Sequence, residues 1–103
     1  MKKVFESNKN LYLSIMEDKH NQNKTNYSNG LISCYEYMTI NKTIYFGKDV
    51  VNMSLFSMKD FLKKSDEYIS CSPIENEKKI LDIISTYINN YVTLVELHSI
   101  NRE

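Results

Sequence analysis

Apolar and polar residues alternate with a period of two along the first half of the chain, which is the pattern of strands that bury one face. The alternation is clearest over Leu11 to Glu17, and it recurs on both sides of a short polar turn at residues 41–43. A long polar segment, residues 20–30, ends in the turn-forming pair Asn29-Gly30. The pattern therefore predicts strands at residues 2–6, 11–17, 32–40 and 44–50.

The second half of the chain changes to the 3.6-residue period of helices. Ser57 stands where it can cap a first helix. The sequence SPIE, residues 72–75, is typical of a second helix start, because it places proline at the first helical position and a capping-box glutamate after it. These signals predict helices over about 58–70 and 73–97. A strand over residues 91–97 is the alternative, since that segment is rich in strand formers.

Together these elements predict a small α+β protein. A chain of 103 residues suits one domain, so residues 1–103 are expected to share a single core. The sheet is expected over residues 2–51 as a three- or four-stranded antiparallel β-meander. The two C-terminal helices then cover its aliphatic face, and the other face is left to the solvent.

Glu36 interrupts the apolar face of one predicted strand, and Lys48 interrupts that of the next. A register that pairs Ile40 with Ile44 places Glu36 directly opposite Lys48. Opposite charges in that position lie about 5 Å apart and stabilise a sheet by roughly 0.2–1 kcal/mol. We therefore interpret Glu36 and Lys48 as a structural ion pair, with a catalytic role for Glu36 as the alternative.

Tyrosines gather on the opposite face of the predicted sheet. Tyrosine combines a large contact area with a hydrogen-bonding tip and few torsions to freeze, so it is enriched where proteins bind one another. Because it is also a good strand former, the same residues are consistent with a purely structural role. The partner-binding residues predicted from this face are Tyr12, Tyr35, Tyr37 and Tyr45.

The amino-acid composition says more about the source genome of the chain than about its chemical activity. The chain has no alanine, twelve lysines and one arginine, and Asn, Lys, Ile and Tyr supply 43 of its residues. This bias indicates an AT-rich genome: that of a low-GC bacterium, its phages or its mobile elements, or that of an AT-rich eukaryote or virus. A net charge of zero argues against an electrostatic hold on nucleic acid or membranes. No signal peptide or membrane-spanning run is expected, so we predict a cytoplasmic protein with reduced thiols at Cys34 and Cys71.

A search for catalytic and cofactor motifs finds little. His20, His98 and the two cysteines are isolated, without the spacing of a zinc site or of a nucleophile beside its base. Two isolated glycines cannot form a phosphate-binding loop. No cofactor or metal is therefore expected, and the sequence favours a binding protein over an enzyme.

The favoured hypothesis is a small inhibitor or accessory protein of a phage or mobile element, of the anti-CRISPR kind, that binds a larger protein or ribonucleoprotein through its tyrosines. The alternative is a small-ligand binder or enzyme that uses a pocket between loop 20–30 and the sheet, with His20, Cys34 or Glu36. A nucleic-acid-binding regulator ranks third. The last helix also offers a surface for a homodimer, because Leu97 and Ile100 depart from its apolar stripe.

Overall fold

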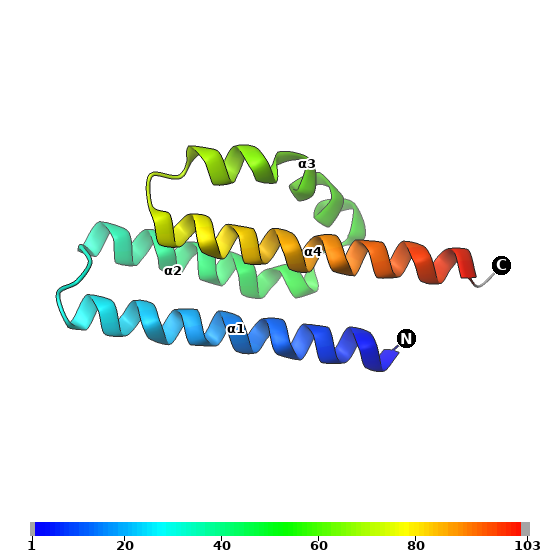
Figure 1. Ribbon diagram of the computed structural model, residues 1–103, viewed down its shortest axis with the longest axis horizontal. Coiled ribbons are helices and arrows are strands. Elements are labelled where there is room, and N and C mark those ends of the chain that lie inside the picture. Colours follow the sequence, from blue (N-terminus) through cyan, green and yellow to red (C-terminus); the bar gives the residue numbers. More distant parts are fainter. Residues whose placement is uncertain (1, 102–103) are drawn as a thin grey trace.

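The computed structural model describes residues 2–101, and all of its regular structure is helical (Figure 1). No strand occurs among these residues, so the predicted α+β fold and its β-meander over residues 2–51 are wrong. The chain instead folds as a four-helix bundle with a short 3-10 turn after the second helix. The elements are α1 (Lys2–Ser28), α2 (Cys34–Asp49), η1 (Val50–Asn52), α3 (Leu55–Cys71) and α4 (Glu75–Asn101).

The two longest helices, α1 and α4, run antiparallel along the molecule (Figure 1). Each has 27 residues and is therefore about 40 Å long, whereas α2 and α3 have 16 and 17. Helix α2 packs against both α1 and α4, and α3 packs mainly against α4. The result is an elongated bundle of 55 × 27 × 16 Å, in which the outer ends of α1 and α4 extend past the shorter helices.

Helix α2 occupies the region where two strands and a turn were predicted. Its buried residues are Ile40, Thr43, Ile44 and Gly47, whose spacing of three, one and three residues is that of one helical face. The helix starts at a cap: the Ser33 side chain accepts a hydrogen bond from the Glu36 backbone N–H. Glu36 thus occupies the acidic position of an S-x-x-E start, where its charge favours the positive end of the helix.

Helix α1 buries the face opposite to the one expected for a strand. Tyr12, Met16 and Asn23 are buried at helical spacing, whereas Leu11 is 64% exposed. The helix also includes most of the segment predicted as a loop, ending at Ser28. The chain then turns through Gly30, whose φ of +73° is a left-handed conformation that glycine adopts without strain.

The second half of the chain is helical where helices were predicted, with shifted starts. Helix α3 is capped by Ser54, which accepts from the Ser57 N–H, so it begins before the expected cap. Helix α4 begins at Glu75, because Ser72 ends α3 and its hydroxyl accepts the Ile74 N–H instead. Residues 91–97 belong to α4, so the alternative strand there is wrong.

A carboxylate at the start of α4 links three parts of the bundle. The two carboxylate oxygens of Glu77 accept hydrogen bonds from the Thr43 hydroxyl on α2, at 2.9 Å, and from the Ser72 hydroxyl in the α3–α4 turn. Both hydroxyl residues are buried. Each hydroxyl also has a backbone carbonyl within reach, that of Thr39 for Thr43 and that of Ile74 for Ser72, so Glu77 supplies a second, charged acceptor that ties the two elements to α4.

We expect Glu77→Ala to lower the free energy of unfolding by about 2 kcal/mol, since hydrogen bonds to a charged group contribute roughly 1.5–3 kcal/mol. Urea denaturation of the purified chain measures the change. The matched control is Glu75→Ala, because Glu75 is an exposed acid in the same first turn of α4. Equal losses in the two variants would show that only the charge at the helix start matters, and would contradict a role for the hydrogen bonds.

Candidate functional site

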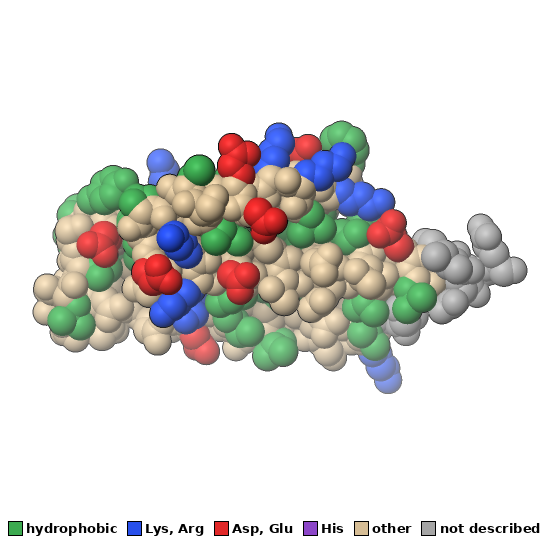
Figure 2. All heavy atoms as spheres, turned by 45° about the horizontal axis from the view of Figure 1, so that its top comes forward, with side chains coloured by type: hydrophobic (Ala, Val, Ile, Leu, Met, Phe, Trp, Pro, Cys, Tyr) green, Lys and Arg blue, Asp and Glu red, His purple; other side chains and the backbone are tan. Residues whose placement is uncertain are grey.

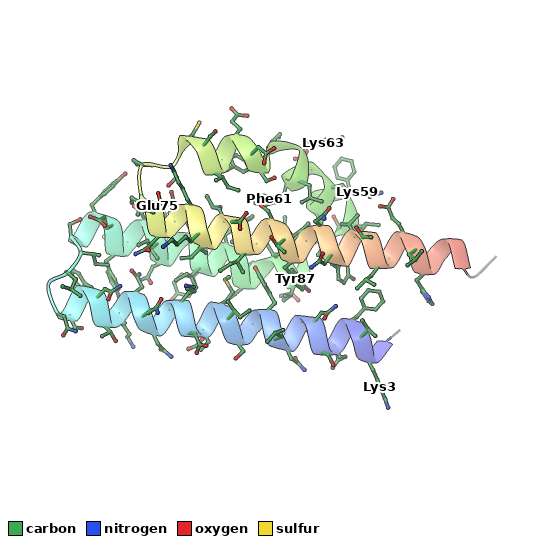
Figure 3. The ribbon with its side chains drawn as sticks, in the orientation of Figure 1. Lys3, Lys59, Phe61, Lys63, Glu75 and Tyr87 are labelled. Atoms are coloured by element: carbon green, nitrogen blue, oxygen red, sulfur yellow. The ribbon has the colours of Figure 1, made fainter. Side chains whose placement is uncertain are left out.

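A groove of about 370 Å³ lies between α1 and α4, and we call it the α1–α4 groove. It runs between the two longest helices, and Figure 3 shows Tyr87 projecting from α4 toward α1 in this region. Its lining residues come from one face of each helix: Phe5, Asn8, Leu11, Tyr12, Ile15, Asp82, Ile83, Thr86, Tyr87, Asn90, Tyr91 and Leu94.

Aromatic rings form the base of this groove. Tyr12 and Tyr87 stack with ring centroids 4.0 Å apart, and the Tyr12 hydroxyl donates a 2.6 Å hydrogen bond to the Gly47 carbonyl on α2. Phe5 and Tyr91 contact each other nearer the chain ends, at 5.4 Å. Burial raises the pKa of both Tyr12 and Tyr87, so the base of the groove stays uncharged even in mildly alkaline solution.

The ring contacts fix how the two antiparallel helices face each other. Since Phe5 lies level with Tyr91 and Tyr12 with Tyr87, the helical rise places Asn8 level with Asn90. By the same register, Ile15 lies level with Ile83. The groove therefore has apolar residues toward both ends, one asparagine from each wall at an intermediate level, and Asp82 at the end where Ile15 and Ile83 lie.

The walls carry few charges, and most of their apolar side chains, such as Phe5, Ile15 and Leu94, are half-buried. Asp82 is the only charged residue among those that line the groove. Leu11 is 64% exposed, and Val4 (43%) and Leu97 (51%) extend the apolar stripes of the two helices. Residues 4, 8, 11 and 15 of α1 recur at intervals of four, three and four, which is the spacing of a coiled-coil seam.

The four tyrosines predicted to bind a partner do not share a face, because the sheet that would have aligned them is absent from residues 2–101. Tyr12 is buried at the base of the groove. Tyr35 and Tyr45 are exposed on α2 (66% and 56%), and Tyr37 stacks on Tyr27 with ring centroids 4.3 Å apart. Their role in partner binding stays a prediction, with only Tyr12 placed at the groove.

The predicted ion pair between Glu36 and Lys48 is wrong. Both residues lie on α2, twelve positions and therefore about 18 Å apart along its axis. Lys48 instead pairs with Glu17 of α1, with Nζ and carboxylate oxygen 2.9 Å apart. The hydrogen bond and charge of Lys48 lower the pKa of Glu17. The pair is solvent-exposed, so we attribute little stability to it.

The pocket predicted between loop 20–30 and the sheet does not form as expected, since most of that segment is helical and no sheet is present among residues 2–101. Segment 20–30 lines a small pocket of about 20 Å³, and Glu36 lines a separate open cleft of about 370 Å³ at the start of α4. His20 is half-buried on α1, where its ring meets the Tyr45 ring edge-on at 5.8 Å. Cys34 and Cys71 are free thiols, and both are exposed rather than packed among apolar residues. Within the described residues, no three His, Cys, Asp or Glu side chains are grouped to bind a metal.

A second exposed apolar area lies on the α3 side. Phe56 is 82% exposed at the edge of a shallow cleft of about 450 Å³, which also includes Phe46, Phe61 and Tyr68. Figure 2 shows that positive and negative side chains are mixed on this side of the molecule, with hydrophobic ones between them. Over the described residues, no helix is both long and apolar enough to span a bilayer.

Sequence reasoning missed the α1–α4 groove, although one of its signals was noted: Leu97 departs from the buried stripe of α4. The side chain of Ile100, predicted to share this surface, lies outside the described part of the chain. A groove with aromatic and aliphatic walls and a single charged residue suits an apolar ligand or the apolar face of a polypeptide. Comparisons with protein-family models, curated proteins and solved structures find no match to this chain.

Proposed function

We propose that this is a non-enzymatic protein-binding protein, whose α1–α4 groove receives an apolar helical face of another polypeptide. The observation that carries the proposal is the exposed apolar stripe along the groove, with Leu11 at 64% exposure and a single charged lining residue. Contiguous exposed apolar surface on a small protein usually marks an interaction site. Two stripes of helical spacing, side by side, match the anchors that an amphipathic helix presents.

The proposed biological setting rests on composition rather than on the groove. The bias toward Asn, Lys, Ile and Tyr supports a gene from an AT-rich genome, and small size with zero net charge suits an accessory protein. A phage or mobile-element protein that inhibits a host defence complex, as anti-CRISPR proteins do, is the setting we favour.

Photo-cross-linking from inside the groove tests the proposed function. A benzophenone amino acid replaces Leu11 in one variant and Leu31 in the control, because Leu31 is a similarly exposed leucine (72%) in the α1–α2 turn, outside the groove. Irradiation in cells of the source organism should attach a polypeptide to position 11 and several-fold less to position 31. Mass spectrometry identifies the attached chain.

A small apolar ligand is the second candidate, because 370 Å³ lies within the usual size range of ligand pockets. In that case position 11 would capture no polypeptide, and native mass spectrometry of the purified chain would show a bound small molecule. Equal capture of polypeptides at positions 11 and 31 would also overturn the proposed function, since the groove would then have no preference.

A further inference from the structure

We infer that Cys34 and Met38 form a binding site for a soft metal ion, Cu(I), at the start of α2. The two residues stand one helical turn apart, so they lie on the same side of the helix, and their sulfur atoms are 3.8 Å apart. Both side chains are exposed, Met38 by 60%. The site lies beside the α1–α2 turn, at the end of the bundle away from the two termini (Figure 1). It shares no residue with the lining of the α1–α4 groove, so it goes beyond the proposed function.

The distance between the two sulfur atoms fits two ligands of one metal ion. A bond between a metal ion and a thiolate sulfur is about 2.3 Å long, so a single ion can join sulfurs that are at most about 4.6 Å apart. At 3.8 Å, the same bond length gives a sulfur–metal–sulfur angle of about 110°, which is close to the angles of tetrahedral and trigonal coordination. The ion can therefore be bound without a change in the backbone of α2.

The two ligands select the metal. Thiolate and thioether sulfurs are soft ligands that favour Cu(I), whereas zinc takes thiolate, imidazole or carboxylate ligands. Among the described residues, no three His, Cys, Asp or Glu side chains are grouped, so zinc would lack ligands at Cys34. Without metal, the Cys34 thiol donates to the Met38 sulfur. When Cu(I) binds, the thiol proton passes to the solvent, a thiolate–copper bond forms, the thioether donates a lone pair, and the copper stays Cu(I).

The surroundings of Cys34 hold its sulfur in place. The Gly30 N–H donates to the Tyr27 carbonyl near the end of α1, with nitrogen and oxygen 3.1 Å apart, and this turn leads the chain back past Tyr27. The Tyr27 ring stacks on the Tyr37 ring, with centroids 4.3 Å apart. A hydrogen bond between its phenol and the Cys34 sulfur, together with the charge of that sulfur, raises the pKa of Tyr27. The phenol therefore keeps its proton and supports the deprotonated sulfur that a metal ion requires.

Competition with the coloured Cu(I) chelator ferrozine, in the absence of oxygen, tests the site in the purified chain. Met38→Leu should weaken Cu(I) binding at least about tenfold, because even a residue that only supports a metal ligand typically contributes that much. Cys34→Ser should abolish binding at this site. The control Cys71→Ser removes the other exposed thiol, which has Glu67 and Tyr68 rather than methionine one turn before it. This control should bind Cu(I) like the unmodified chain.

X-ray absorption at the copper edge tests the ligands directly. The unmodified chain loaded with Cu(I) should show sulfur neighbours at about 2.3 Å, and Met38→Leu should show one sulfur fewer. Circular dichroism verifies that the variants stay helical, as expected for substitutions of exposed side chains. A chain that takes no Cu(I) from ferrozine overturns the site, and so does loss of binding in Cys71→Ser. Equal affinity in Met38→Leu and the unmodified chain also overturns it, because the contact between the sulfurs would then be only a weak hydrogen bond.

Discussion

Gly47→Val is expected to lower the free energy of unfolding by about 3 kcal/mol or more. Gly47 of α2 faces both α1 and α4: a Cβ added there would stand 2.8 Å from the Met16 sulfur and 3.1 Å from Ile84 Cδ1. Met16 and Ile84 are fully buried, so neither can move into solvent. Overpacking of this kind costs about 1–3 kcal/mol for small additions, and valine adds a branched group.

The substitution separates packing from helix propensity. Valine is a better helix former than glycine by a few tenths of a kcal/mol, so propensity alone would predict a slight gain. The control Lys42→Val places the same side chain at an exposed position of α2 and should cost less than about 1 kcal/mol. Urea denaturation compares the two variants. Similar stabilities would show that the three helices are not packed around Gly47.

Gly47 also explains why α2 was mistaken for strands. The face that α2 buries includes a glycine and a threonine, so a search for apolar residues at helical spacing does not detect it. Ile32, Met38 and Ile40 meanwhile alternate with polar residues and imitate a strand. The local signal at the start of the helix was present, since Ser33 and Glu36 form an S-x-x-E pair. Such a pair predicts a helix start only when the residues after it show a helical pattern, and here they did not.

Helix α1 shows a different limit of sequence reasoning. Its core-facing positions include Asn23, whose amide nitrogen hydrogen-bonds to the Tyr37 carbonyl and to Asn41. A buried asparagine with partners on another helix looks like a loop residue in the sequence. The exposed Leu11, in turn, belongs to a second stripe beside the one that faces the core. Two stripes on α1 blur its 3.6-residue period, whereas the buried stripes of α3 and α4 are clear in the sequence, and both helices were predicted.

The candidate site could not be deduced from local patterns, because its walls come from opposite ends of the chain. What places Asn8 beside Asn90 is the stacking of Tyr12 on Tyr87, a contact between residues far apart in the sequence. Tyrosine is chemically suited to partner binding, which is why four tyrosines were predicted to bind a partner. Of those four, only Tyr12 lines the groove, and it forms the base. Its hydroxyl is used inside the bundle, on the Gly47 carbonyl.

Tyr12 should make the bundle less stable in alkaline solution, and this loss of stability can be measured. Burial, with a smaller effect from Tyr87, raises the pKa of Tyr12 above its ordinary value of 10.0. Between these two values the unfolded chain releases the phenol proton and the folded chain keeps it, so stability is lost as the pH rises above 10. The loss from this residue is about 1.4 kcal/mol per pH unit.

The effect of Tyr12→Phe on the free energy of unfolding should therefore change sign with pH. At pH 7 the variant loses the hydrogen bond to Gly47 and should be less stable by about 1 kcal/mol. Above pH 10 the phenylalanine has no proton to release, so the variant does not lose stability in this way. The unmodified chain loses its advantage of about 1 kcal/mol by about pH 11, and the two curves of unfolding free energy against pH should cross there. Tyr35→Phe, at a ring that is 66% exposed, should follow the unmodified chain throughout. Parallel curves for Tyr12→Phe and the unmodified chain would mean that this phenol is accessible to water, and that the base of the α1–α4 groove is open.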